Sequence, residues 1–301
     1  MSLTSSNRLA ALRRKFGKDQ PKEITQEAFD HDRGHLRRLA RLGSREKAQA
    51  IDLWNYTQDL LYTDIQKSLL MFLLPFCLEA WSSDLSATNS SYSGFVESFY
   101  TALAKKKIFD EYLTREQAMG VSEFMQGSIL DEIDEQRGLF YEGMNSRPYR
   151  WIPGLMTYGV LLPDVERLWG DWWSLNTVGR ATAAIQYASC LIYPDDGNPV
   201  FAPFTPNRGG GPPLLWEFEG VLYEHHWMGK NLEFLRRILT PSGVSELLRH
   251  AAEVLKNQPG HDVASRILSD LPMCSETLKE RCAELPRLLE MSGERPLSWT
   301  R

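Results

Sequence analysis

The stretch SLLMFLLPFCLEAW, residues 68–81, decides the fold, because it holds ten successive uncharged and mostly large apolar residues, Leu69–Leu78. A ten-residue helix is about 15 Å long, roughly half the hydrocarbon thickness of a bilayer. Lys67 and Glu79 close the run on either side. At helical spacing its apolar residues cover nearly the whole circumference, which is typical of a helix at the centre of a core. The run therefore favours a core helix over a membrane span.

The composition is that of a soluble globular protein, with 301 residues, 43% hydrophobic and 24% charged. The first eight residues already include a charge, and no apolar secretory segment follows them. The four cysteines form no CxxC pair, which indicates reduced thiols. We therefore expect a cytoplasmic protein.

The charge is distributed unevenly along the chain. Residues 1–50 carry twelve Lys or Arg and six Asp or Glu, whereas the remainder is acidic. In the basic segment the charged residues alternate with Leu and Ala at helical spacing, without the glycine-aromatic pattern of RNA-binding sheets. We expect this segment to contact the rest of its own chain or a second copy, and we expect the partner of the chain to be another protein or a second copy. Nucleic acid is an unlikely partner, and no membrane contact is expected.

Helical spacing predicts a mainly α, multi-helix globular fold. Thr114 and Gln117 form a capping-box pattern before an apolar series, and 131–136, DEIDEQ, is expected to be a solvated face. A change of composition near 140 predicts two subdomains, a helical bundle over 1–140 and an aromatic-rich helical part over 141–301, although one continuous domain is equally compatible. The helices expected early in the chain cover 6–16, 25–42, with a C-terminal cap at Gly43, and 44–61, with an N-cap at Ser44.

The least helical part of the sequence is 194–226, where prolines and glycines exclude a long helix. Two segments that favour extended backbone flank a TPNRGGGPP loop, so we expect a small extended or β-hairpin insertion around 198–224. Long irregular segments in compact domains are often functional.

The residues WEFEGVLYEHHW, 216–227, are the main candidates for chemistry. Glu217 and Glu219 would share one face of a strand, and His225 and His226 follow them, so these four side chains are candidate catalytic groups for acid-base chemistry or metal binding. The competing interpretation is a charged edge strand with a solvated histidine pair. Four tryptophans are candidate walls of a ligand pocket, although tryptophans at this density also form cores: Trp172, Trp173, Trp216 and Trp227.

Other patterns give no specific chemistry. His31 and His35 are one helical turn apart, but the arginines that follow them disfavour a bound cation. The sequence has no GxSxG, no dinucleotide fingerprint and no phosphate-binding loop motif. We therefore predict neither a cofactor nor a metal, and leave open whether the chain is an enzyme.

The stretch from Trp54 through LLPFCLEAW to LTREQAMGVSEFM resembles small uncharacterised helical proteins of bacteria, some of them thought to neutralise toxins. It covers under a third of the chain, and no functional residue is carried over from it. Two functions are expected from the sequence. The first is a non-catalytic binding or interaction protein, immunity-like or regulatory. The alternative is a hydrolase-like enzyme with an acid-base or metal site formed by the Glu and His residues of 217–226.

Overall fold

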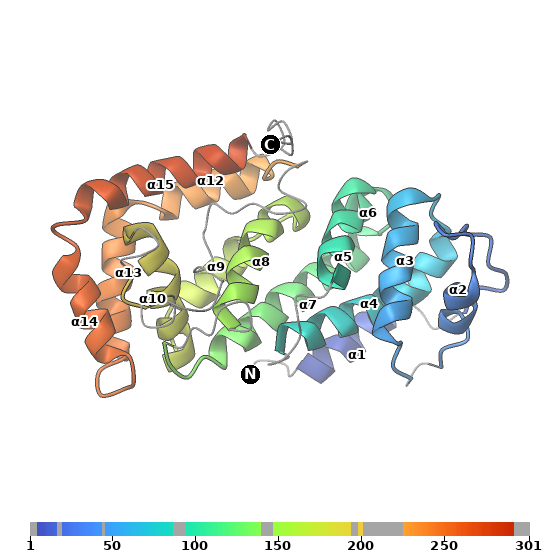
Figure 1. Cartoon of the computed structure of the whole chain (residues 1–301), viewed down its shortest axis with the longest axis horizontal. Coiled ribbons are helices and arrows are strands. Elements are labelled where there is room, and N and C mark those ends of the chain that lie inside the picture. Colours follow the sequence, from blue (N-terminus) through green and yellow to red (C-terminus); the bar gives the residue numbers. More distant parts are fainter. Residues whose placement is uncertain are drawn as a thin grey trace. The chain divides into compact units, whose positions relative to one another are not determined.

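The computed structural model describes residues 5–16, 20–43, 46–86, 94–139, 147–193, 198–200 and 225–291. Within these residues the chain is mainly α-helical, as predicted, with 14 helices and no strand (Figure 1). The contacts divide the chain into two compact units, Met1–Ser128 and Ile129–Arg301. The subdomain boundary predicted near 140 falls at 140–146, outside the described residues, and stays a prediction.

The first unit consists of six helices and the start of a seventh. They are α1 (Ser5–Phe16), α2 (Gly34–Leu39), α3 (Ala50–Tyr62), α4 (Lys67–Ser86), α5 (Gly94–Lys105), α6 (Ile108–Glu111) and α7 (Arg115–Asp134).

The second unit contains the end of α7 and the helices that follow it. These are α8 (Arg147–Leu161), α9 (Glu166–Trp173), α10 (Val178–Ile192), α12 (Gly229–Ile238), α13 (Pro241–Val254), α14 (His261–Asp270) and α15 (Ser275–Glu290).

Helix α4 forms the core of the first unit. Leu69, Leu73 and Leu78 are completely buried, and the buried indole of Trp81 donates a hydrogen bond to the hydroxyl of Tyr100 at 2.8 Å. Within the described residues, Lys67–Leu85 is the one segment long and apolar enough to cross a membrane, and 56% of its most apolar window is buried in the protein. The apolar run thus packs against its neighbouring helices.

Helix α1 packs on α4 and accounts for part of the basic N-terminal segment. Arg13 forms an ion pair with Glu79 at 2.7 Å and lies over the ring of Phe76, and Arg8 donates to the carbonyl of Gly127 at 3.1 Å. These contacts hold α1 against its own chain, within the first unit.

The second predicted helix is much shorter than expected. Helix α2 begins only at Gly34, because aspartate side chains before it cap backbone N–H groups in turns. Asp30 accepts from the N–H of Asp32 at 3.0 Å, and Asp32 accepts from the N–H of Gly34 at 2.8 Å. His31 has a φ of 65°, which also excludes a helix there.

The observed helix ends test the helix caps that the sequence predicted. Helix α3 begins at Ala50 after Gln49, so the N-cap predicted at Ser44 is wrong, and the C-cap of α2 is Ala40 instead of Gly43. The capping box is confirmed: Thr114 Oγ1 accepts from the N–H of Gln117 at 3.3 Å, and Gln117 Oε1 accepts from the N–H of Thr114 at 3.0 Å.

The acidic stretch 131–136 is more than a solvated face, which corrects the prediction. Glu132 is only 3% exposed, since the end of α7 lies within the second unit. Asp134 accepts two hydrogen bonds from Arg180, at 2.9 and 3.0 Å, and one from the hydroxyl of Thr177 at 2.6 Å. These bonds join the end of α7 to the start of α10.

Aromatic rings on α8, α9 and α10 form the core of the second unit. Trp172 lies at their centre and is completely buried, with Trp151, Trp169 and Tyr187 in edge or tilted contact at centroid distances of 5.3–5.4 Å. Trp173 extends this cluster from Trp169 at 5.5 Å. The tryptophan-rich sequence is therefore accounted for largely by core packing.

The β-hairpin insertion predicted around 198–224 is not supported. Its first residues, 198–200, form a turn in which Asn198 donates to Ser189 Oγ and accepts from the N–H of Val200, each at 3.0 Å. The remaining residues, 201–224, lie outside the described residues, and no strand occurs elsewhere in the described part.

Candidate functional site

The predicted acid-base site is only partly within the described residues. Glu217, Glu219 and Trp216 lie outside them, so their proximity to His225 and His226 stays a prediction. His226 is exposed, and its Nδ1 lies 2.8 Å from the carbonyl oxygen of Glu290 at the end of α15.

Trp227 is an anchor in the core of the second unit. It is 4% exposed, its indole N–H donates to the carbonyl of Met156 at 2.7 Å, and its ring packs against Gly159. The next residue, Met228, donates its N–H to the carbonyl of Gly159 at 3.0 Å. Both carbonyls belong to α8, so the residues that precede α12 are fixed on that helix.

The tryptophans proposed as pocket walls have unequal exposure. Trp172 is completely buried within the aromatic cluster and presents no ring face to solvent, while Trp173 is partly buried. Trp172 and Trp227 are therefore occupied by contacts within the fold. Their role as walls of a ligand pocket stays a prediction.

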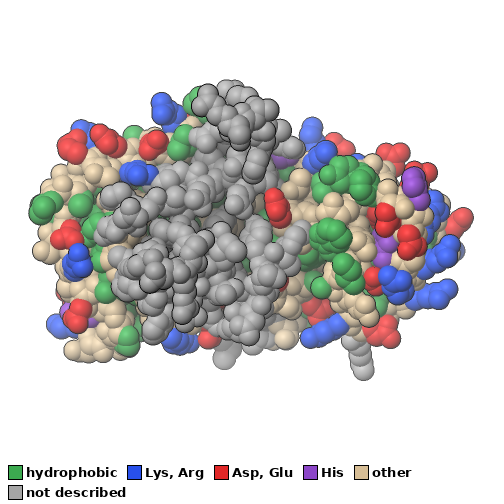
Figure 2. All heavy atoms as spheres, viewed as in Figure 1, with side chains coloured by type: hydrophobic (Ala, Val, Ile, Leu, Met, Phe, Trp, Pro, Cys, Tyr) green, Lys and Arg blue, Asp and Glu red, His purple; other side chains and the backbone are tan. Residues whose placement is uncertain are grey.

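A different surface, on the first unit, exposes large apolar side chains. Ile51, Trp54 and Tyr62 occupy positions i, i+3 and i+11 of α3 and are 56%, 38% and 57% exposed. Phe29, 55% exposed, lies with its ring centroid 4.5 Å from that of Tyr62. We call these four residues the α3 aromatic face. Figure 2 shows hydrophobic side chains exposed among charged ones over this part of the first unit.

The opposite side of α3 holds this face in place through Asp59. Its carboxylate is 2% exposed; Oδ1 accepts from the backbone N–H of Phe29 at 2.8 Å, and Oδ2 lies 2.6 Å from Nε2 of His35. Burial by itself lowers the pKa of His35, but the hydrogen bond and negative charge of Asp59 outweigh it and raise the pKa above its usual value. The raised pKa favours the protonated form of His35 beside the carboxylate that fixes Phe29.

Cationic side chains accompany the α3 aromatic face. Lys105 Nζ lies 5.4 Å from the centroid of Tyr62. Arg38 of α2 forms a bidentate pair with buried Asp52 of α3, at 2.6 and 3.0 Å. The exposed Arg37 and Arg41 have no ion pair among the described residues, so their charges are available to a partner.

The sequence analysis did not identify this face, because it assigned no exposed side to the helix predicted over 44–61. The sequence did contain a signal for an exposed apolar side, because α3 has two stripes of apolar residues. Its contacts with α2 and α5 bury one stripe and leave the other exposed. Within the described residues no group of three or more His, Cys, Asp or Glu is arranged to hold a metal ion.

Comparisons with known proteins add no family, because no family model, curated protein or solved structure matches the chain.

Proposed function

We propose that the chain is a non-catalytic binding protein that holds a partner protein on the α3 aromatic face. The observation that carries this proposal is the exposure of four large apolar residues on one side of one unit: Phe29, Ile51, Trp54 and Tyr62. Single exposed apolar residues are common, but several large ones along one helix, two of them with their rings in contact, are typical of interaction surfaces. Tryptophan and tyrosine are also enriched among the residues that dominate binding energy.

The charges near this face favour a protein over a nucleic acid as the partner. Exposed Asp30 follows Phe29 directly, and exposed Asp64 lies two residues after Tyr62, so phosphate groups would be repelled beside both rings. Arg37 on α2 and Arg41 just after it complement carboxylates. We therefore expect a protein partner that presents an apolar patch with both basic and acidic residues at its border. A cytoplasmic location remains part of this proposal.

A photocrosslinking experiment tests the proposal. p-Benzoylphenylalanine is introduced at position 54, and separately at exposed Glu123 on α7 of the same unit as a matched control. A protein captured from position 54 alone is then purified and titrated with wild type, Trp54→Ala and Glu123→Ala. We expect Trp54→Ala to weaken binding about thirtyfold, a loss of roughly 2 kcal/mol, and Glu123→Ala to leave it unchanged.

Two results would overturn the proposal. One is the absence of any protein crosslinked from position 54 above the level at position 123. The other is that only nucleic acid is captured there, with an affinity that falls steeply as salt is added.

The hydrolase-like alternative rests on Glu217, Glu219, His225 and His226, and on an extended segment around 198–224 that would align the two carboxylates. No contact among the described residues favours it. It stays a prediction from the sequence and is second to the binding function.

A further inference from the structure

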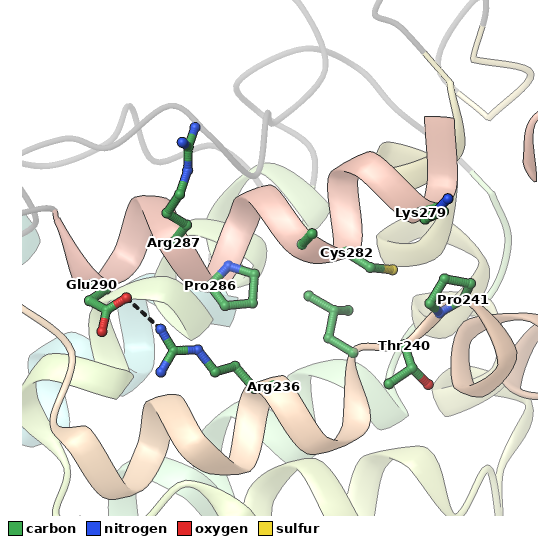
Figure 3. A pocket seen from close by; sticks show the side chains of 10 residues that line it. Arg236, Thr240, Pro241, Lys279, Cys282, Pro286, Arg287 and Glu290 are labelled. Carbon is green, nitrogen blue, oxygen red and sulfur yellow. Dashed lines mark hydrogen bonds and ion pairs between the residues drawn. The ribbon is translucent and has the colours of Figure 1, made fainter. Parts of the chain in front are cut away.

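A groove of about 470 Å³ lies between α12 and α15 in the second unit (Figure 3). It reaches the turn at Thr240 and Pro241, where α13 begins. Pockets for small molecules typically have volumes of about 300–1,000 Å³, so the groove has room for a compact ligand. Its lining residues all belong to the second unit, and one of them, Glu290, also holds His226 through its backbone carbonyl.

The floor of the groove is apolar. Leu239 and Cys282 are 2% and 5% exposed, and Pro286 is buried beside them. Burial raises the pKa of Cys282 to about 12, so its thiol stays protonated and neutral at physiological pH. A neutral thiol contributes soft, polarisable surface instead of a nucleophile. The floor therefore suits the hydrocarbon part of a ligand.

The rim of the groove is cationic. Arg236, Lys279 and Arg287 line it, against a single carboxylate from Glu290. Residues 129–301 contain 17 Lys or Arg and 23 Asp or Glu, so this unit has a negative net charge. The groove, lined by three cations and one anion, has a positive net charge. Glu280 and Glu284 of α15 do not line it. Two of the three basic residues of α15, Lys279 and Arg287, therefore lie at the groove, and Arg281 does not.

The rim cations are only loosely held by the protein itself. Arg236 pairs with Glu290 at 2.5 Å, but both side chains are about half exposed, at 44% and 53%, and such surface pairs contribute little. Figure 3 shows these two side chains directed toward each other and Arg287 directed outward. Arg287 has no ion pair among the described residues. A ligand carboxylate can therefore engage Arg236 without breaking a strong internal bond, and Arg287 adds positive charge to the same rim.

We infer that this groove binds a small organic anion, a carboxylate on an apolar body, with its charge at the Arg236–Arg287 rim and its hydrocarbon on Leu239, Cys282 and Pro286. Tight binding requires both parts of the ligand. An inorganic anion would not cover the apolar floor, and a neutral hydrocarbon would not interact with the cations of the rim. The inference is independent of the proposed function, since it concerns a different unit.

Binding of decanoate to the full chain, measured by isothermal titration calorimetry, tests the inference. The comparison ligands are decyltrimethylammonium, which reverses the charge, and inorganic phosphate, which lacks the apolar body. Ala283→Trp fills the groove from its exposed edge without changing a charge. Arg287→Glu reverses one rim charge, and Lys256→Glu is the matched reversal at an exposed site outside the groove. Circular dichroism of each variant verifies folding.

We expect decanoate to bind at least about tenfold more tightly than either comparison ligand. Ala283→Trp should abolish binding, Arg287→Glu should weaken it about tenfold, and Lys256→Glu should leave it unchanged. Equal binding of the cationic and anionic amphiphiles would overturn the inference. So would decanoate binding that persists in folded Ala283→Trp, or no binding of decanoate to the wild type.

Discussion

His35 Nε2 and Asp59 Oδ2 lie 2.6 Å apart in a buried pair on the first unit, with side chains 4% and 2% exposed. Because the same carboxylate holds the N–H of Phe29, this pair joins the inner side of α3 to the α3 aromatic face. Breaking one partner of a buried ion pair leaves the other without compensation. We expect Asp59→Asn to lower the free energy of unfolding by about 3 kcal/mol in urea denaturation. A loss below about 1 kcal/mol would show that the pair is not formed as described.

The same pair predicts a pH dependence. The folded pKa of His35 is raised above its usual value of 6.5, so the native state binds the proton more tightly than the unfolded chain. Its contribution to stability is then fully present below about pH 6.5 and is lost as the pH rises through the folded pKa. Urea denaturation between about pH 6 and pH 9 should show this decline in the wild type. His35→Gln keeps a hydrogen-bond donor but not the titration, so an equal decline in that variant would contradict the assignment.

A glycine on α8 makes room for Trp227. A Cβ at Gly159 would overlap the indole ring, whereas a Cβ at Gly170 on α9 would meet no atom within 4 Å. Gly159→Ala should therefore lower stability by about 1–3 kcal/mol through overpacking. Gly170→Ala, the matched control, should raise it by up to about 1 kcal/mol because alanine favours a helix. Thermal denaturation compares the two; a stabilising Gly159→Ala would mean that Trp227 does not pack there.

Asn231 satisfies three backbone groups in the second unit. It donates to the carbonyls of Gly159 and Leu162, at 3.0 and 2.8 Å, and accepts from the N–H of Val165 at 3.2 Å. Asn231→Leu has a similar volume but removes the bonds to the carbonyl of Leu162 and the N–H of Val165, while Gly159 keeps its bond from Met228, so it should cost about 2–3 kcal/mol. Asn231→Asp retains the acceptor and directs a carboxylate at two carbonyls, so it should cost at least as much. Near-native stability of either variant, measured by urea denaturation, would exclude this role.

The sequence predicted the helical class and the core helix because those depend on patterns within one segment. The Leu and Phe residues around α4 are sufficient to make it the core helix of its unit, and Thr114 with Gln117 cap α7 through local bonds. Helix α2 was predicted too long because the turns of Asp30 and Asp32 compete with helical hydrogen bonds over a few residues. Local propensity alone does not decide that competition.

The candidate sites were less accessible to sequence reasoning because they depend on which face meets a neighbour. Tyr56 and Trp54 are two residues apart on α3, yet one is completely buried and the other 38% exposed. Likewise, the cations of α15 gather around a groove only when α12 lies beside it. Such surfaces follow from the packing of helices distant in sequence, which periodicity does not specify.

The two sides of α3 should respond differently to the same substitution. Trp54→Ser removes a ring that is 38% exposed and should lower the free energy of unfolding by about 1 kcal/mol. Tyr56→Ser removes a fully buried ring from the same helix and should cost at least about 3 kcal/mol, because it leaves a cavity. Urea denaturation of both variants gives the comparison.

If Trp54→Ser destabilises the chain as much as Tyr56→Ser, then the ring of Trp54 supports the fold, and the α3 aromatic face is not a binding surface for a partner. If Trp54→Ser lowers the free energy of unfolding by only about 1 kcal/mol, a loss of partner binding in Trp54→Ala is attributable to the contact itself.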